Sequence, residues 1–151
     1  MKIKRITGIG ACVETGKMDE AVAFFRDIFG AKVVAEEPFW EKFGFRAQGT
    51  WLGSDIPFRL EMEECIDDTN PVGRQIKRVA PGYQFLGVQV EDIDEAIAEL
   101  RSKGIQVSDK LKMEVPGFES AYECMIHPKN TFGLIVELVE FKGQTLPDGD
   151  W

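Results

Sequence analysis

IGACV at Ile9–Val13 and MDEAV at Met18–Val22 return about 75 residues later as LGVQV at Leu86–Val90 and IDEAI at Ile93–Ile97. Each copy has an apolar strand pattern, an Asp that can cap a helix, a helical pattern and a glycine that ends it. Two half-size copies indicate a duplicated unit with a pseudo-twofold axis, because one copy alone cannot bury its apolar face. We therefore expect the functional site in the cleft between the two copies.

The spacing of apolar residues predicts a β-α-β-β-β unit in each copy and an α+β fold. The first copy is expected to hold a strand at 6–13, a helix at 19–29 and strands at 31–36, 43–52 and 58–63. The second is expected to hold a strand at 83–90, a helix at 94–103 and strands near 105–110, 119–127 and 133–141. The expected organisation is one domain: module one at 1–66, a linker at 67–81 with a short basic helix at 72–79, module two at 82–141 and a surface tail at 142–151.

The composition excludes several classes of protein. The chain has 151 residues, 44% of them apolar, which is enough to fill one core, and its net charge of −8 argues against nucleic-acid binding. Its longest apolar stretches are far shorter than the roughly 18 residues of a membrane span, and no signal-peptide core follows Met1, so we expect a cytoplasmic protein. Three cysteines without a C-x-x-C pair indicate reduced thiols rather than disulfides or a thiolate zinc site.

Three longer motifs resemble one known superfamily. They are the helical segment Met18–Gly30 (MDEAVAFFRDIFG), the strand Arg59–Glu63 (RLEME) and the closing run His127–Val139 (HPKNTFGLIVELV). Across residues 6–141 the chain is similar to the vicinal oxygen chelate superfamily, also called the glyoxalase/bleomycin-resistance fold, and within it to the methylmalonyl-CoA epimerase branch. The resemblance implies two edge-joined β-α-β-β-β modules that form a cup-shaped mixed sheet. It also implies a metal inside the cup, held by two His and two carboxylate or amide side chains.

The chain departs from this family pattern at the metal ligands. The resemblance places the two ligand histidines at Gly8 and Phe85, so both imidazoles are absent, whereas the two acidic positions remain as Glu61 and Glu137. Two carboxylates, with at most Gln84 as a third oxygen ligand, make a weak site for zinc, cobalt or nickel, which favour imidazole or thiolate. We therefore expect no cofactor, and a divalent metal is disfavoured.

Carbonyl chemistry without a metal needs side chains that move a proton and stabilise an enolate. We expect Glu137 to be the base, since a carboxylate among apolar neighbours on an inward-facing strand has a raised pKa. Glu61 is its candidate partner, and Glu41 or Lys42 falls where the resemblance places a catalytic carboxylate. Two structural alternatives remain open: Glu137 as a former ligand held by hydrogen bonds, and Glu61 with Glu63 in solvent.

The candidate substrate-binding residues are mostly aromatic. The first half of the chain is rich in aromatic side chains, most of which we expect in the sheet core, and any that line the cup favour a flat or apolar substrate. His127 stands in a His-Pro turn, where a structural hydrogen bond is the alternative to substrate contact. The predicted substrate-binding residues are Phe85, Gln84, Trp40, Phe45, Trp51 and His127.

These features together predict an isomerase, an epimerase or racemase that moves a proton at the carbon next to a carbonyl of a hydrophobic or thioester substrate. A planar ketone resembling an isoflavonoid and a thioester are both open as substrates, and Arg74, Lys77 and Arg78 form a local basic patch for phosphates. Two rival functions remain: a non-catalytic, resistance-type protein that binds a hydrophobic ligand, and a metal-dependent lyase of the glyoxalase type. The expected partners are a small molecule and a second copy of the chain, with no nucleic acid and no membrane.

Overall fold

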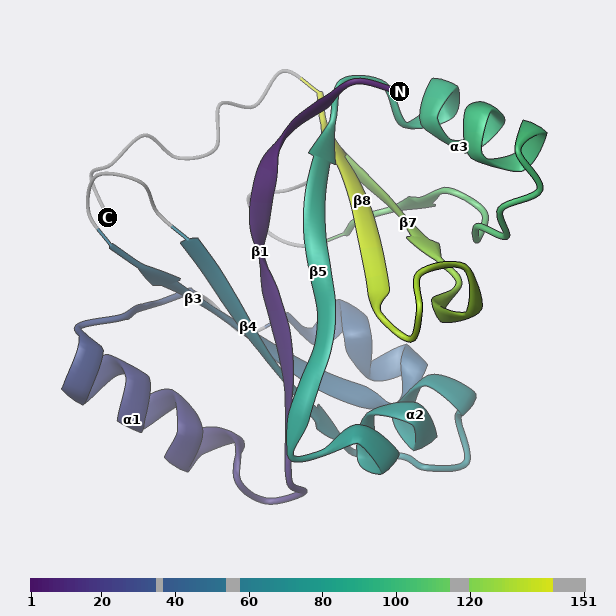
Figure 1. Cartoon of the computed structure of the whole chain (residues 1–151). Coiled ribbons are helices and arrows are strands. Elements are labelled where there is room, and N and C mark those ends of the chain that lie inside the picture. The colour runs from purple at the N-terminus through teal and green to yellow at the C-terminus, as the bar shows by residue number, and fades with distance from the viewer. Residues whose placement is uncertain (35–36, 54–57, 115–119, 143–151) are drawn as a thin grey trace. The chain divides into compact units, whose positions relative to one another are not determined.

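The chain divides into two units, each built on a β-sheet (Figure 1). The computed structural model describes residues 1–34, 37–53, 58–114 and 120–142. Of these, residues 1–8 and 85–142 belong to unit 1, and residues 9–84 belong to unit 2. The strands β1 (Ile3–Val13) and β5 (Gly82–Val90) each contribute residues to both units. None of the helices in the described residues is long and apolar enough to cross a membrane.

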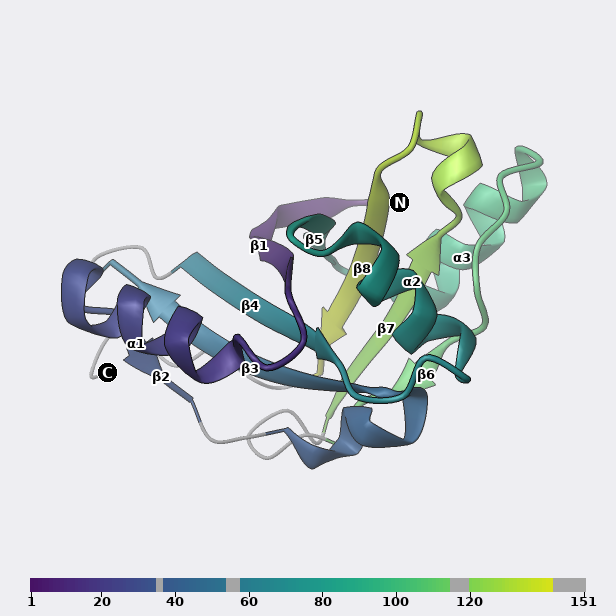
Figure 2. The ribbon, with the colours of Figure 1, turned by 90° about the horizontal axis from the view of Figure 1, so that it is seen from below.

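Unit 2 combines a sheet with two α-helices and one 3-10 helix. Its elements, besides the end of β1, are α1 (Met18–Phe29), β2 (Lys32–Val33), the 3-10 helix η1 (Pro38–Phe43), β3 (Phe45–Leu52), β4 (Phe58–Cys65) and α2 (Pro71–Val79). The strand order is β2-β3-β4-β1, and α1 packs against β3 and β4 (Figure 2). Helix α2 begins where the Asn70 side chain accepts a hydrogen bond from the Val72 N–H, with Pro71 at its first position.

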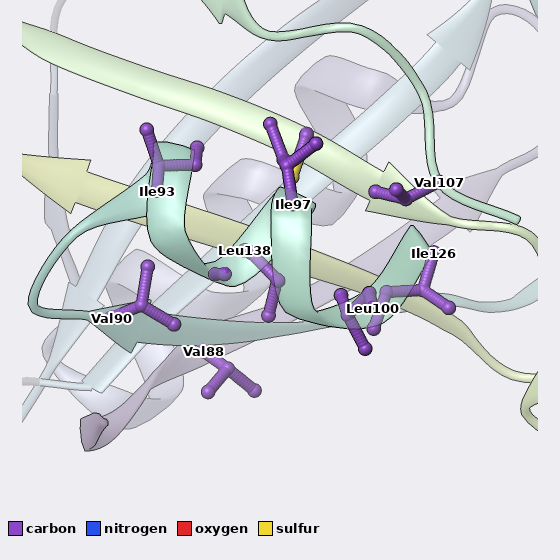
Figure 3. Close-up of a cluster of buried hydrophobic side chains, with 10 residues drawn as sticks. Val88, Val90, Ile93, Ile97, Leu100, Val107, Ile126 and Leu138 are labelled. Carbon is purple, nitrogen blue, oxygen red and sulfur yellow. The ribbon is translucent and has the colours of Figure 1, made fainter. Parts of the chain in front are cut away.

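Unit 1 repeats the order of one strand, one α-helix and three further strands in the second half of the chain. Its elements, besides the start of β1 and most of β5, are α3 (Ile93–Ser102), β6 (Leu111–Lys112), β7 (Ala121–Ile126), the 3-10 helix η2 (Pro128–Asn130) and β8 (Ile135–Phe141). The strand order is β1-β5-β8-β7-β6, with β5 parallel to β8 and the β7 pairs antiparallel, so the sheet is mixed. The apolar face of α3 packs on this sheet, as Figure 3 shows for Ile93, Ile97, Leu100 and Leu138.

The element order confirms the predicted fold, two successive β-α-β-β-β runs with a short helix between them. The predicted strand near 105–110 is wrong, because only Val107 forms a single bridge there, to Ile126, and the strand comes later as β6. Side chains interrupt the ladder at this point: the Gln106 N–H donates to Asn130 Oδ1, and the Met125 N–H donates to Ser108 Oγ. Side-chain bonds of this kind compete with strand pairing.

Smaller differences concern the first half of the chain. The strand predicted at 43–52 begins two residues later, because residues up to Phe43 belong to η1 and Gly44 turns the chain with a φ of 85°. A Cβ at Gly44 would also lie 2.5 Å from the Asp67 carbonyl oxygen, so this turn requires glycine. The strand predicted at 31–36 is only the two residues of β2, and residues 35–36 lie outside the described part. Most of the predicted tail, 143–151, also lies outside it.

Candidate active site

In unit 2, Glu61 and Glu63 of β4 lie on the face of the sheet opposite α1. Successive residues of a strand point to opposite faces. Glu64 points to the α1 side, where it accepts a hydrogen bond from the Lys17 N–H at 3.1 Å, so Glu61 and Glu63 point the other way. Both are 5% exposed, so the interpretation that places them in solvent is wrong. We call this face the carboxylate face of unit 2.

Arg59 ties two carboxylates of unit 2 into a buried ion-pair network. Its Nη2 lies 2.7 Å from Glu61 Oε2 and 2.7 Å from Glu37 Oε1. The other Glu37 oxygen accepts a hydrogen bond from Trp40 Nε1 at 2.7 Å. One guanidinium thus bridges two buried carboxylates, and Glu61 is engaged in an ion pair with a fixed cation.

Gln84, Cys12 and Glu63 form a second polar group in unit 2. The Cys12 thiol donates to Gln84 Oε1 at 3.4 Å, and its sulfur lies 4.0 Å from Glu63 Oε2. Burial, and secondarily the charge of Glu63, raise the pKa of Cys12 to about 12, so this thiol is a poor nucleophile at neutral pH. Glu63 was not among the residues predicted for the site, where it stood only as a neighbour of Glu61. The period-two alternation of β4 is the signal that makes Glu63 a candidate in its own right.

The aromatic residues that were expected to bind substrate are all buried. In unit 2, Trp40 and Phe45 stack with ring centroids 5.7 Å apart, and Trp51 lies beside Arg59 in the β3–β4 register. In unit 1, Phe85 is buried beside Ile135 of the neighbouring strand. Each ring therefore contributes to the core of its own unit, and contact with a substrate stays a prediction.

In unit 1, Glu137 of β8 lies on the face of the sheet opposite α3. Its neighbours in sequence, Val136 and Leu138, pack on the α3 cluster, so Glu137 between them points the other way. The residue is 8% exposed. Across the strands it is aligned with Gly87 of β5 on one side and Met125 of β7 on the other. We call this face the carboxylate face of unit 1.

A glycine leaves room for the Glu137 carboxylate. A Cβ on Gly87 would lie 3.2 Å from Glu137 Oε2 and only 2.4 Å from Thr7 Oγ1. The hydroxyl of Thr7 and a carboxylate oxygen of Glu137 therefore both lie over the bare backbone of Gly87, one from β1 and the other from β8. Any larger residue at position 87 would displace at least one of them.

The residue of β1 whose side chain lies over Gly87 together with Glu137 is Thr7, which no motif in the sequence singles out. The resemblance placed the first ligand position at Gly8, one residue further along. In the structure the Thr7 side chain lies above Gly87, where Gly8 contributes only its carbonyl oxygen, 3.5 Å from the position of a Cβ there. Neither residue carries an imidazole. Because side chains alternate along a strand, a shift of one residue decides which residue of β1 lies on the same face as Glu137. No local motif in the sequence fixes that position.

The remaining candidates lie on the surface of their units. Glu41 and Lys42 are exposed residues of η1, and the Lys42 ammonium lies 3.6 Å from the centroid of the Phe39 ring. His127 is exposed in unit 1, where its Nδ1 accepts a hydrogen bond from the Lys129 N–H at 3.2 Å and so caps η2. The His127 contact is the structural hydrogen bond that the sequence analysis gave as the alternative to substrate contact.

The donor set does not fit a transition metal. The family pattern calls for two imidazoles, and in unit 1 the positions near Glu137 hold Phe85 and Thr7 instead. Within the ranges that the structure describes, no group of three or more His, Cys, Asp or Glu side chains is arranged to hold a metal ion. Zinc, cobalt and nickel favour imidazole or thiolate ligands, which these residues do not supply.

Fold and side chains agree with one superfamily. The family model of the Glyoxalase/Bleomycin resistance protein/Dioxygenase superfamily matches residues 5–138, and the chain belongs to this superfamily. A comparison with curated proteins finds no matching sequence.

Several solved structures with this fold are methylmalonyl-CoA epimerases. The enzyme from Mycobacterium tuberculosis is 22% identical, with 91% of this chain and 88% of that chain covered and a TM-score of 0.76. A variant of the Streptomyces coelicolor enzyme, in complex with 2-nitronate-propionyl-CoA, is 25% identical, with 94% of this chain and 100% of that chain covered and a TM-score of 0.77. The structural neighbours therefore fall in the branch to which the sequence motifs point.

Proposed function

We propose that this chain is an epimerase or racemase that moves a proton at the carbon next to a carbonyl group of a hydrophobic or thioester substrate. The observation that carries the proposal is the placement of Glu137. Its side chain is buried on the carboxylate face of unit 1, and an oxygen lies over Gly87, which has no side chain of its own. A carboxylate held in this way is suited to take a proton from carbon as a general base.

A second group must return a proton to the other face of the carbon. The sequence names Glu61, Glu41 and Lys42 for this role, and the carboxylate face of unit 2 adds Glu63. Glu61 already pairs with the Arg59 guanidinium at 2.7 Å, so its carboxylate is engaged in the ion-pair network of unit 2. Single substitutions of these four residues, each assayed in both directions of the reaction, distinguish them.

We further propose that the reaction proceeds without a transition metal. Two observations support this proposal. The imidazoles of the family pattern are missing, and the buried carboxylate of Glu137, which can take up a proton, has the hydroxyl of Thr7 near it. Elemental analysis of the purified protein tests the proposal. One equivalent of zinc, cobalt, nickel or iron, lost together with activity on chelation, contradicts it and favours the glyoxalase-type alternative.

The comparisons supply the first compounds to assay. Neighbouring structures are named methylmalonyl-CoA epimerase, and one of them holds 2-nitronate-propionyl-CoA. Methylmalonyl-CoA is therefore the first thioester to assay as a substrate, and the nitronate is the first compound to test for binding. A chiral planar ketone represents the other substrate class, since aromatic residues pack beside the carboxylate face of unit 2. The basic residues of α2 that could meet phosphates are partly engaged, because Lys77 pairs with Asp68 at 2.7 Å.

The experiment is hydrogen exchange at the α-carbon in deuterated water, followed by mass spectrometry, with loss of optical rotation measured on the same samples. The protein is first treated with a chelator. The reaction starts from a single enantiomer of a carbonyl substrate. We expect deuterium to appear at its α-carbon as the optical rotation falls. If thioesters and ketones bind but none exchanges its α-hydrogen, the chain is a binding protein. This is the second candidate function, and the loss of both imidazoles also favours it.

A homodimer is part of the proposal. The surface of α1 exposes the large apolar side chains Phe24, Ile28 and Phe29. Exposed apolar groups gathered on one helix are typical of a contact with another protein. Sedimentation equilibrium measures the mass of the protein in solution. Ordinary homodimers persist at concentrations of tens of micromolar. A monomer mass in this range contradicts this part of the proposal.

A further inference from the structure

Thr7 places a hydroxyl beside the proposed base. Its Oγ1 and Glu137 Oε2 both lie within 3.2 Å of one point, the position that a Cβ on Gly87 would occupy. The two side chains come from β1 and β8, the strands on either side of β5. A donor and a carboxylate thus converge on the carboxylate face of unit 1 from opposite sides of Gly87.

The Thr7 hydroxyl is available as a donor. Among the residues that the structure describes it makes no hydrogen bond, in contrast to Thr15, Thr50, Thr69 and Thr131, whose hydroxyls each bond an oxygen of the protein. Thr7 is partly buried. A threonine hydroxyl has one proton to donate, and it rotates to meet an acceptor.

Proton removal next to a carbonyl creates a need for such a donor. When the α-carbon loses its proton, the electron pair moves toward the carbonyl oxygen, and the oxygen gains negative charge. In a site whose residues do not fit a metal, that charge must be stabilised by preorganised hydrogen-bond donors. A hydroxyl next to the base is well placed, because the carbonyl oxygen and the α-proton belong to adjacent carbons.

We propose that Thr7 is a catalytic residue whose hydroxyl donates a hydrogen bond to the carbonyl oxygen of the substrate while Glu137 takes the α-proton. The inference rests on the proposed epimerase function. In the forward step the C–H bond breaks, the proton binds to the Glu137 carboxylate, and the enolate oxygen accepts the Thr7 hydrogen bond. Thr7 keeps its proton throughout. Return of a proton to the other face of the carbon restores the carbonyl and completes inversion.

The isosteric substitution Thr7→Val tests the role of the hydroxyl. Loss of one oxyanion donor costs roughly 10²–10³-fold in kcat, so we expect α-hydrogen exchange in deuterated water to slow by about that factor with little change in KM. Thr7→Ser restores a hydroxyl in a smaller side chain and is expected to recover most of the rate. Thr69→Val, which removes an exposed hydroxyl elsewhere, is the matched control and should exchange at the parent rate.

The nitronate probe separates this role from packing. A nitronate carries negative charge on oxygen, as the enolate does. We therefore expect Thr7→Val to weaken binding of 2-nitronate-propionyl-CoA by at least tenfold while leaving propionyl-CoA binding unchanged, about 1.4 kcal/mol of selective loss. If the wild-type chain exchanges a substrate but Thr7→Val exchanges it at the same rate, or if Thr7→Ser is as slow as Thr7→Val, the role of Thr7 is wrong and the epimerase function stands. If the wild-type chain exchanges none, both fail.

Discussion

Each unit pairs a glycine with a buried carboxylate on the neighbouring strand, and the two pairs are used differently. Gly49 is aligned with Glu61 in unit 2, and Gly87 is aligned with Glu137 in unit 1. Above Gly49 lie Glu37 Oε1 and Arg59 Nε, at 3.2 and 3.4 Å from the position of a Cβ. Above Gly87 lie the Thr7 hydroxyl and the Glu137 carboxylate itself.

The difference lies in what surrounds the carboxylate. Glu61 lies beside a cation that also binds Glu37, so its charge is part of a fixed ion-pair network. Glu137 shares the space over Gly87 with the hydroxyl of Thr7, a neutral group that can donate a hydrogen bond. A glycine aligned with a buried carboxylate thus accompanies an ion-pair network between antiparallel strands in unit 2 and a candidate base between parallel strands in unit 1. The predictions below test this contrast.

The largest effect on stability is expected from Arg59→Met. Removal of the cation takes away the guanidinium that pairs with both Glu37 and Glu61, and breaking a buried ion pair in this way costs about 3–5 kcal/mol. The free energy of unfolding in urea measures the loss. Arg26→Met, which removes an exposed partner of Asp27, is the matched control and should leave stability close to that of the parent. Equal stability of both variants contradicts the network.

A smaller effect is expected from the two glycines. Gly87→Ala brings a methyl group 2.4 Å from Thr7 Oγ1, and such overpacking costs roughly 1–3 kcal/mol. In Gly49→Ala the nearest atom is a Val34 methyl at 2.9 Å, so a smaller loss of stability is expected. Gly87→Ala should also slow exchange, because it displaces Thr7 or Glu137. If Gly49→Ala is the more damaging of the two, the crowding above Gly87 is overestimated.

The smallest effect concerns Glu99, a half-buried carboxylate outside both pairs. Hydrogen bonds from Lys103 and the terminal ammonium lower the pKa of Glu99 to about 2. A lowered folded-state pKa contributes stability above the unfolded pKa, near 4.5, and loses it as the pH falls toward 2. We therefore expect the stability difference between the parent and Glu99→Gln to be present at pH 6 and to vanish near pH 2. A difference that grows on acidification contradicts this linkage.

The repeat predicted the fold because it is a pattern of whole elements. Two strand-helix copies with matching starts and stops leave few alternatives for the order of elements, and the period-two alternation of β4 placed Glu61 and Glu63 on one face. The strand predicted near 105–110 is wrong because the Gln106 N–H bonds the side chain of Asn130 and the Met125 N–H bonds the side chain of Ser108, so that only the single bridge of Val107 to Ile126 forms there. Such contacts leave no periodic signal.

The candidate site was predictable only in part. Glu137 follows from a strand pattern within one motif, whereas Thr7 depends on which of two adjacent residues of β1 faces Glu137. A shift of one residue along a strand reverses the face, and only the register between strands decides it. The Arg59 network joins β4 to a residue just before η1, and no sequence spacing links Arg59 to Glu37.

The most direct test of the account is the rate of α-hydrogen exchange by Glu137→Gln in deuterated water. Glutamine keeps the size of the side chain and removes its capacity to take a proton. General-base catalysis contributes about 10²–10⁴-fold, so we expect exchange to fall by that factor while ligand binding and unfolding free energy stay near the parent values. Exchange by Glu137→Gln at the parent rate contradicts the central claim that Glu137 is the base.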